Sequence, residues 1–137
     1  MSMIKIGSDG RALAQPSLAA FLDQKNGLMW AANDGCDKAL NYADAEKAVA
    51  EFRSAGFSDW RLPTIDELET LRDRSRFNPA ADPELGLKSS YYWSSTPFAE
   101  SPSDFAWFVY FNYGGSSFGS RYATAFVRAV RSARASQ

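Results

Sequence analysis

The stretch from Gly56 to Leu71 constrains the fold more than any other part of this sequence. Its opening glycine can adopt the left-handed backbone conformation that ends a preceding helix. Pro63 disfavours helical backbone at the residue before it, so no helix runs through the middle of the stretch. Thr64 and Glu67 have the spacing of a capping box, in which the side chain of each residue bonds the backbone of the other. We therefore expect one helix to end near the glycine and a second helix to begin at Ile65.

The two helices are expected at residues 42–55 and 65–72. The first has apolar residues at helical spacing along one face, namely Tyr42, Ala45, Val49 and Phe52. Asn41 is a suitable N-cap for it. The connection between the helices contains Phe57, Trp60 and Leu62, which are too apolar for an ordinary surface loop, so we expect it to pack onto the core.

Short apolar runs predict the strands. They lie at residues 4–6, 18–22, 28–30, 91–95, 105–112 and 125–132, with a glycine-rich turn before the last one. Residues 75–90 show neither the helical nor the strand spacing of apolar residues, which predicts a long irregular loop region. The pattern indicates an α+β fold in one domain, residues 1–137, with two helices against a small, twisted, mainly antiparallel sheet. All four tryptophans, Trp30, Trp60, Trp93 and Trp107, are expected in the core.

The composition bounds the class of protein. A chain of 137 residues with 45% hydrophobic and 15% aromatic residues can form a real core. No apolar run approaches the roughly 20 residues that cross a bilayer, so membrane insertion is not expected. The first ten residues lack the layout of a signal peptide. We therefore expect synthesis in the cytoplasm without general secretion.

Few residues suit catalysis or metal binding. The chain has no histidine, which removes the commonest general base and metal ligand. Cys36 is the only cysteine, and Asp34 and Asp37 beside it disfavour a reactive thiolate. With Asn33, these carboxylates form an oxygen-rich loop, but their spacing does not match a calcium loop. The sequence predicts no enzyme, no metal site and no cofactor.

Charge is distributed unevenly along the chain. All 16 carboxylates lie at or before Asp104, and after it only arginines carry charge: Arg121, Arg128, Arg131 and Arg134. This is not the dense basic face that nucleic acid requires, so nucleic-acid binding is not expected. We expect some of these arginines to pair with carboxylates of the earlier chain. Arg61 is expected to act as a scaffold residue that bonds loop carbonyls or a carboxylate.

Five blocks of this chain resemble, in order, the Lcl C-terminal domain family of bacteria and phages, also called DUF1566. They are Asp23–Trp30 (DQKNGLMW), the stretch Gly56–Leu71, Tyr92–Thr96 (YWSST), Ala106–Val109 (AWFV) and Val127–Arg131 (VRAVR). The resemblance implies a C-type-lectin-like fold, and the chain is most similar to the phage or prophage type. Formylglycine-generating enzymes have a related fold but use a pair of cysteines, which this chain lacks.

The window from Tyr110 to Tyr122 has the composition of a binding surface. It contains only Tyr, Phe, Gly, Ser, Asn and Arg, which combine rigid aromatic contact area with adaptable hydrogen bonds. An ordinary glycine-rich hairpin remains the alternative. In lectin-like folds this region commonly carries the ligand surface, and in some relatives a retroelement diversifies it. The predicted contact residues are Tyr110, Asn112, Tyr113, Ser116, Ser117, Phe118, Arg121 and Tyr122.

Three functions follow from these observations. The first is a non-enzymatic display or recognition domain, carried on a virion, that binds a host surface glycan or protein through the window. The second is a structural virion component, such as a decoration or tail-associated subunit, that uses the same surface to assemble with other virion proteins or as a homo-oligomer. The third, an enzyme, is disfavoured by the absent histidine and the lone cysteine.

Overall fold

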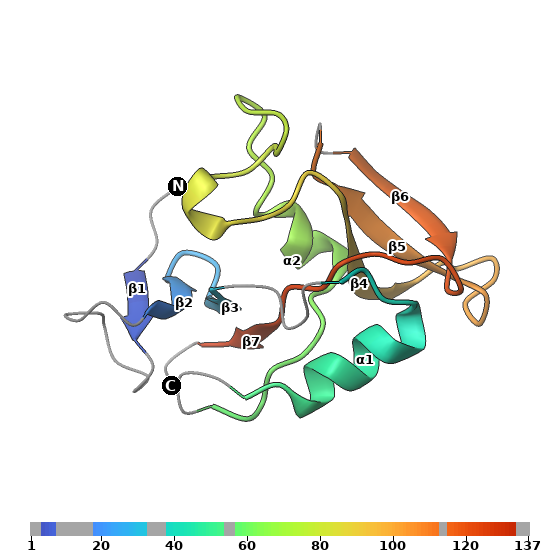
Figure 1. Ribbon diagram of the computed structural model, residues 1–137, viewed down its shortest axis with the longest axis horizontal. Coiled ribbons are helices and arrows are strands. Elements are labelled where there is room, and N and C mark those ends of the chain that lie inside the picture. Colours follow the sequence, from blue (N-terminus) through green and yellow to red (C-terminus); the bar gives the residue numbers. More distant parts are fainter. Residues whose placement is uncertain (1–3, 8–17, 33–37, 54–56, 113–114, 134–137) are drawn as a thin grey trace.

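The computed structural model describes residues 4–7, 18–32, 38–53, 57–112 and 115–133 (Figure 1). These residues form an α+β fold with two small antiparallel sheets and two short helices. The α+β class predicted from the sequence is confirmed. The prediction of one sheet is wrong, because the described strands form two separate sheets.

The first sheet joins the two ends of the described chain. Its four strands are antiparallel, in the order β1-β2-β3-β7. They are β1 (Ile4–Gly7), β2 (Leu18–Asp23), β3 (Leu28–Ala31) and β7 (Val130–Ser132). Asn26 donates from its amide to Asp23 (2.6 Å) in the turn between β2 and β3, where the sequence predicts a hairpin. All four residues of β3 are buried, because the sheet is covered on both faces.

The second sheet is a three-stranded meander of β4 (Tyr91–Pro97), β5 (Phe105–Tyr110) and β6 (Gly115–Ser120). The strand β6 is missed by the sequence analysis, which assigns this segment to a turn. Its sequence, GSSFGS, has low intrinsic β propensity. Pairing with β5 along its whole length, from Tyr110 opposite Gly115 to Phe105 opposite Ser120, makes it a strand.

The segment predicted as one strand at residues 125–132 instead runs from one sheet to the other. Phe126 bonds the backbone of β4, with its N–H donating to the carbonyl of Tyr91 and its carbonyl accepting from Trp93. Only Val130–Ser132 pairs with β3. The same apolar segment therefore closes both sheets.

The helices begin where their caps predict and end earlier than expected. They are α1 (Tyr42–Glu51) and α2 (Ile65–Glu69), followed by a 3-10 turn at Pro83–Leu85. The Asn41 side chain accepts from the Asp44 N–H (2.9 Å), which starts α1. Phe52 then takes extended backbone and ends it, before the predicted stop at Gly56, which lies outside the described residues. Beyond α2, i→i+3 hydrogen bonds continue a tighter turn to Arg72.

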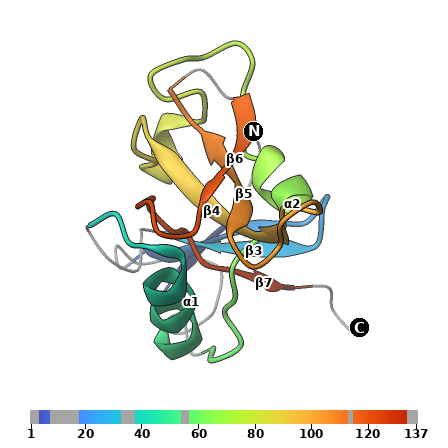
Figure 2. The same ribbon diagram turned by 90° about the vertical axis from the view of Figure 1, so that its right-hand side faces the viewer.

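The core has two parts, one on each face of the first sheet. Met29 and Ala31 face the cluster that includes Tyr42, Ala45 and Val49 of α1. Leu28 and Trp30 face the cluster that includes Leu68 of α2 and the following Leu71. Figure 2 shows α1 below and α2 above this sheet.

Trp30, Trp60 and Trp93 are buried as predicted. Trp107 is only half-buried, and it belongs to neither of the two core clusters. Its core assignment is therefore wrong.

Candidate functional site

The hairpin of β5 and β6 carries most of the predicted contact residues. Ser116, Ser117 and Phe118 are exposed on β6, the outer strand of its sheet. Arg121 and Tyr122 follow directly after the strand. Tyr113 lies outside the described residues. The structure thus places five of the eight predicted residues along β6 and its C-terminal end.

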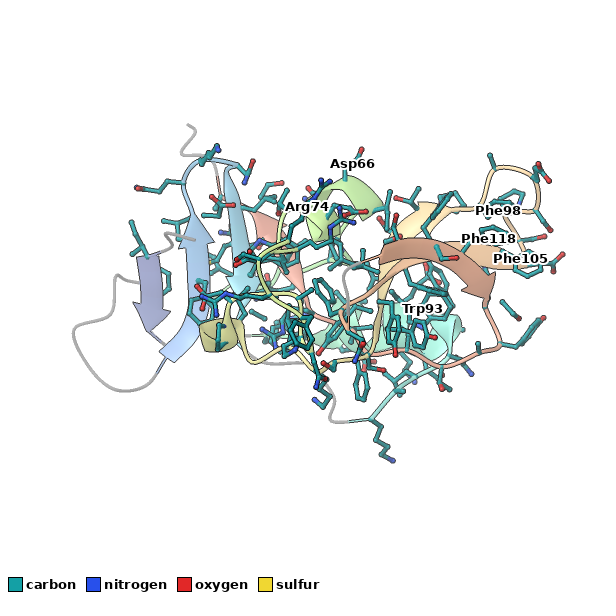
Figure 3. The ribbon with its side chains drawn as sticks, turned by 90° about the horizontal axis from the view of Figure 1, so that it is seen from above. Asp66, Arg74, Trp93, Phe98, Phe105 and Phe118 are labelled. Carbon is teal, nitrogen blue, oxygen red and sulfur yellow. The ribbon has the colours of Figure 1, made fainter. Side chains whose placement is uncertain are left out.

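Phe118 belongs to an aromatic cluster on one face of this sheet, formed by Phe98, Phe105, Trp107 and Phe118. Phe98 and Phe118 stack with ring centroids 3.8 Å apart and an interplanar angle of 13°. Trp107, opposite Phe118 on β5, meets both rings edge-on at about 6 Å. Figure 3 shows Phe98, Phe105 and Phe118 together at one end of the sheet, away from Trp93.

The aromatic cluster is not part of the protein core. None of its four members belongs to either core cluster, and Phe118 is 42% exposed while the other three are half-buried. Aromatic rings that pack on one another at a surface offer contact area that needs little ordering on binding. The aromatic cluster can pack against a ring or an apolar side chain of a ligand. Its phenylalanine and tryptophan side chains do not supply acid–base chemistry.

The opposite face of the sheet has a small apolar cavity of about 230 Å³. It is lined by Tyr91, Trp93, Phe108, Gly119 and residues 123–125. Tyr110 lies on this face and stacks on Tyr91, with centroids 4.4 Å apart. Phe118 pairs with Trp107 and shares its face, whereas Tyr110 is three residues further along β5 and therefore lies on the other face.

A second cavity, which we name the Arg121 cavity, lies where β6 ends against the start of α1. It has a volume of about 190 Å³ and is lined by Asn41, Tyr42, Ala43, Glu46, Ser103, Arg121 and Tyr122. The Arg121 guanidinium lies 4.2 Å from the centroid of the Tyr42 ring. Tyr122 is 84% exposed.

Both charged residues of the Arg121 cavity affect the pKa of Tyr42. Burial raises the pKa of the Tyr42 phenol, the Glu46 carboxylate raises it further, and Arg121 opposes both. The backbone N–H of Tyr42 also donates to the Arg121 carbonyl (2.9 Å), which fixes the strand end against the helix. The Nε of Arg121 is buried and has no hydrogen-bond partner in the described part of the chain.

Asn112 lies at the other end of β6. Its amide donates to Asn78 Oδ1 (3.3 Å), and its carbonyl accepts from the Asn78 N–H (2.6 Å). Asn112 therefore holds the irregular 75–90 region against the hairpin. Its place in the binding window was predicted, but the structure separates it from Arg121 by the length of β6.

Sequence reasoning missed the partners that complete these surfaces. Phe98 and Phe105 join Phe118 only through the pairing of β5 with β6. Glu46 lines the same cavity as Arg121 only through the packing of α1. The alternation of Phe105 and Trp107 along β5 is the one local signal that places two aromatic rings on the same face.

Arg61 acts as the scaffold residue that the sequence predicts. Its guanidinium makes two hydrogen bonds to the Glu67 carboxylate (2.7 and 2.8 Å) and one to the Leu62 carbonyl. This ion pair lowers the pKa of Glu67. An open groove of about 520 Å³ runs past Arg61, between α1 and residues 60–64, but the guanidinium there is already bonded.

Of the C-terminal arginines that the structure describes, Arg128 and Arg131 are bonded to the earlier part of the chain. Arg131 pairs with Asp59 (2.6 and 3.1 Å), as the charge distribution predicts. Arg128 is buried and donates to the carbonyls of Ala31 (3.1 Å) and Leu85 (2.6 Å). These contacts are structural, since each one fastens the C-terminal segment to distant parts of the chain.

Within the described ranges, no group of three or more His, Cys, Asp or Glu residues lies close enough to hold a metal ion. The oxygen-rich loop with Asp34, Cys36 and Asp37 lies outside those ranges. No helix among the described residues is long and apolar enough to span a membrane.

Comparison with known proteins identifies the family. A search of curated proteins finds no match to this chain. The sequence profile of the Lcl C-terminal domain matches residues 19–131, which is most of the chain and includes both sheets except β1, the first residue of β2 and the last residue of β7. The protein therefore belongs to the Lcl C-terminal domain family.

Proposed function

We propose that this protein is a non-enzymatic recognition domain that binds a host surface glycan or protein through β6 and the residues beside it. The observation that carries the proposal is the aromatic cluster, in which rings from β5, β6 and the residue after β4 pack together outside the core. Exposed apolar patches on a small domain commonly mark interaction sites. Serines on the same strand add hydrogen-bonding groups without charge.

The proposed architecture is C-type-lectin-like. Three features support it: the N-terminal hairpin pairs with the C-terminal strand β7, two helices flank the sheets, and a long irregular region precedes β4. The proposed setting, a phage or prophage protein carried on a virion, is supported by the sequence resemblance alone. Diversification of the 110–122 window by a retroelement is part of that resemblance.

Binding and stability measured together test the proposal. The labelled domain is applied to candidate host cells and to a printed glycan array in calcium-free buffer with chelator. Phe118→Ser should weaken attachment at least tenfold, which is the loss expected for a contact hot spot. Phe77→Ser is the matched control, because Phe77 is 79% exposed and lies outside the aromatic cluster. A stable Phe118→Ser variant that attaches normally would place the recognition surface elsewhere.

A structural virion subunit is the second candidate, and the open edge of β6 favours it. This edge strand contains no charged residue and no proline, the features that usually keep edge strands from pairing with other chains. Co-purification with phage tail proteins, without attachment to cells or glycans, would support assembly over host recognition.

A further inference from the structure

We propose that the Arg121 cavity binds one neutral pyranose ring of a glycan. The inference rests on the proposed function, because it names the ligand class for one part of the same surface. The volume of about 190 Å³ is below the roughly 300–1,000 Å³ of pockets for drug-sized ligands. A single sugar ring is therefore a fitting occupant, and a larger ligand would extend out of the cavity along β6.

Charge balance favours a neutral ligand. The lining contains one arginine and one glutamate, and its other members are uncharged. Both charged residues line the cavity beside Tyr42, with the Arg121 guanidinium 4.2 Å from the centroid of its ring. An anionic sugar in this cavity would gain attraction from Arg121 and also meet repulsion from Glu46. A neutral ring with several hydroxyl groups can use both residues at once.

The polar groups of the cavity match what a pyranose offers. The Glu46 carboxylate accepts from hydroxyl groups, whereas the guanidinium of Arg121 donates to ring or hydroxyl oxygens. Arg121 makes no ion pair within the described residues, and its buried Nε is unpartnered. Its stacking on Tyr42 holds the guanidinium plane in one orientation before a ligand arrives.

Tyr122 supplies the apolar part of the site. Its ring is 84% exposed although it borders a polar cavity, and burying such a ring against a ligand removes apolar surface from water. One face of a pyranose presents C–H groups, and a tyrosine ring is a rigid surface for them. The cavity thus combines a donor, an acceptor and an aromatic platform.

Titration with simple sugars tests this site. The probes are the methyl glycosides of glucose, galactose, mannose and N-acetylglucosamine, measured by saturation-transfer NMR in chelator-containing buffer. Methyl glucuronide and glucose 6-sulfate are the charged comparators. We expect at least one neutral glycoside to bind, with an affinity that changes little when salt is raised about tenfold.

Two variants and two matched controls locate the binding. Glu46→Gln and Tyr122→Ala should each lower the affinity for the neutral glycoside at least tenfold while the domain stays folded. The controls are Glu51→Gln and Phe77→Ala, which should each change this affinity less than twofold. Glu51 is an exposed glutamate on the same helix, and Phe77 is an exposed aromatic residue outside the cavity.

Other results would overturn the inference without touching the proposed function. Tighter, salt-sensitive binding of the charged sugars would show that Arg121 dominates Glu46 and that the ligand is anionic. Binding of none of the sugars, with attachment to cells still lost in Phe118→Ser, would leave recognition in place and remove the sugar site. If Glu46→Gln and Tyr122→Ala leave the binding of the neutral glycoside unchanged, the sugar binds at another surface.

Discussion

A Cβ atom on Gly119 would lie 2.5 Å from Cε2 of Phe108, far inside the contact distance of two carbon atoms. The two residues are diagonal neighbours on β6 and β5. The Phe108 ring also meets Tyr91 and Trp93 edge-on, with centroids 4.8 and 6.0 Å away. The ring is thus held across the glycine, where it forms part of the apolar cavity of the second sheet.

Gly119→Ala should therefore destabilise the domain. The added methyl group forces the Phe108 ring out of its contacts, and overpacking of this kind costs about 1–3 kcal/mol of unfolding free energy. Chemical denaturation measures the loss. Combining Gly119→Ala with Phe108→Leu should give less than the sum of the two single effects. Strict additivity would show that the ring moves aside freely.

Thr64→Ala should lower the unfolding free energy by about 0.5–2 kcal/mol. The Thr64 hydroxyl accepts from the Glu67 N–H (3.2 Å), and the Glu67 carboxylate accepts from the Thr64 N–H (2.9 Å). Removing the hydroxyl leaves an N–H of the first turn of α2 without its cap. Attachment to the ligand should not change. An unaltered denaturation midpoint would contradict the role of this capping box.

Lowering the pH should reduce the unfolding free energy of the domain, partly through protonation of Glu67. The Arg61 guanidinium and the Thr64 backbone hold the pKa of Glu67 below its usual range. The stability that this carboxylate contributes is present above about pH 4.3, the ordinary glutamate value, and is lost as the pH falls through the lower folded value. The difference in unfolding free energy between wild type and Glu67→Gln should therefore be largest near neutral pH and shrink in acid. A difference independent of pH would contradict the ion pair.

Trp93→Ala and Phe118→Ala should separate core from surface. Trp93 is 1% exposed and donates from its indole to the Leu40 carbonyl (2.9 Å), so its truncation should cost about 3–5 kcal/mol and unfold much of the protein. Phe118 is 42% exposed and loses mainly its stacking on Phe98, which is worth about 0.5–1.5 kcal/mol. Thermal melts of the two variants measure this contrast. Equal losses would show that Phe118 is core.

Chelation should leave the melting temperature unchanged. The described residues contain no cluster of metal-ligating side chains, and calcium requires six to eight oxygen ligands. Scanning calorimetry with excess EDTA and then with calcium measures the effect. A rise of several degrees with calcium would point to the loop of Asn33, Asp34 and Asp37.

Sequence reasoning was most successful where the interactions are local. The caps at Asn41 and Thr64 lie three residues from the groups that they bond, so both helix starts were predictable. Helix ends were not, because α1 stops where Phe52 turns to pack against the core ring of Trp60, with centroids 5.4 Å apart. That contact depends on residues beyond the helix.

The binding window shows the same division. Its composition identified the exposed residues Ser116, Ser117, Phe118 and Tyr122, because small polar and aromatic residues without an apolar period seldom form a core. It could not show that Tyr110 lies on the opposite face from Phe118. The sheet face on which a side chain lies is set by strand register. The low β propensity of β6 gives no indication of that register in the sequence.

The sequence by itself determined the α+β class, the capped helix starts, the burial of three of the four tryptophans and the stretch of chain in which the exposed aromatic residues lie. Each of these depends on spacing within a few residues or on how much apolar surface a side chain must bury. Only the tertiary structure decided that 125–132 bonds to two sheets, that Trp107 joins Phe98 and Phe118 at the surface, and that Glu46 and Arg121 line one cavity. These relationships join residues far apart in the chain, so they exist only after the strands have paired and α1 has packed.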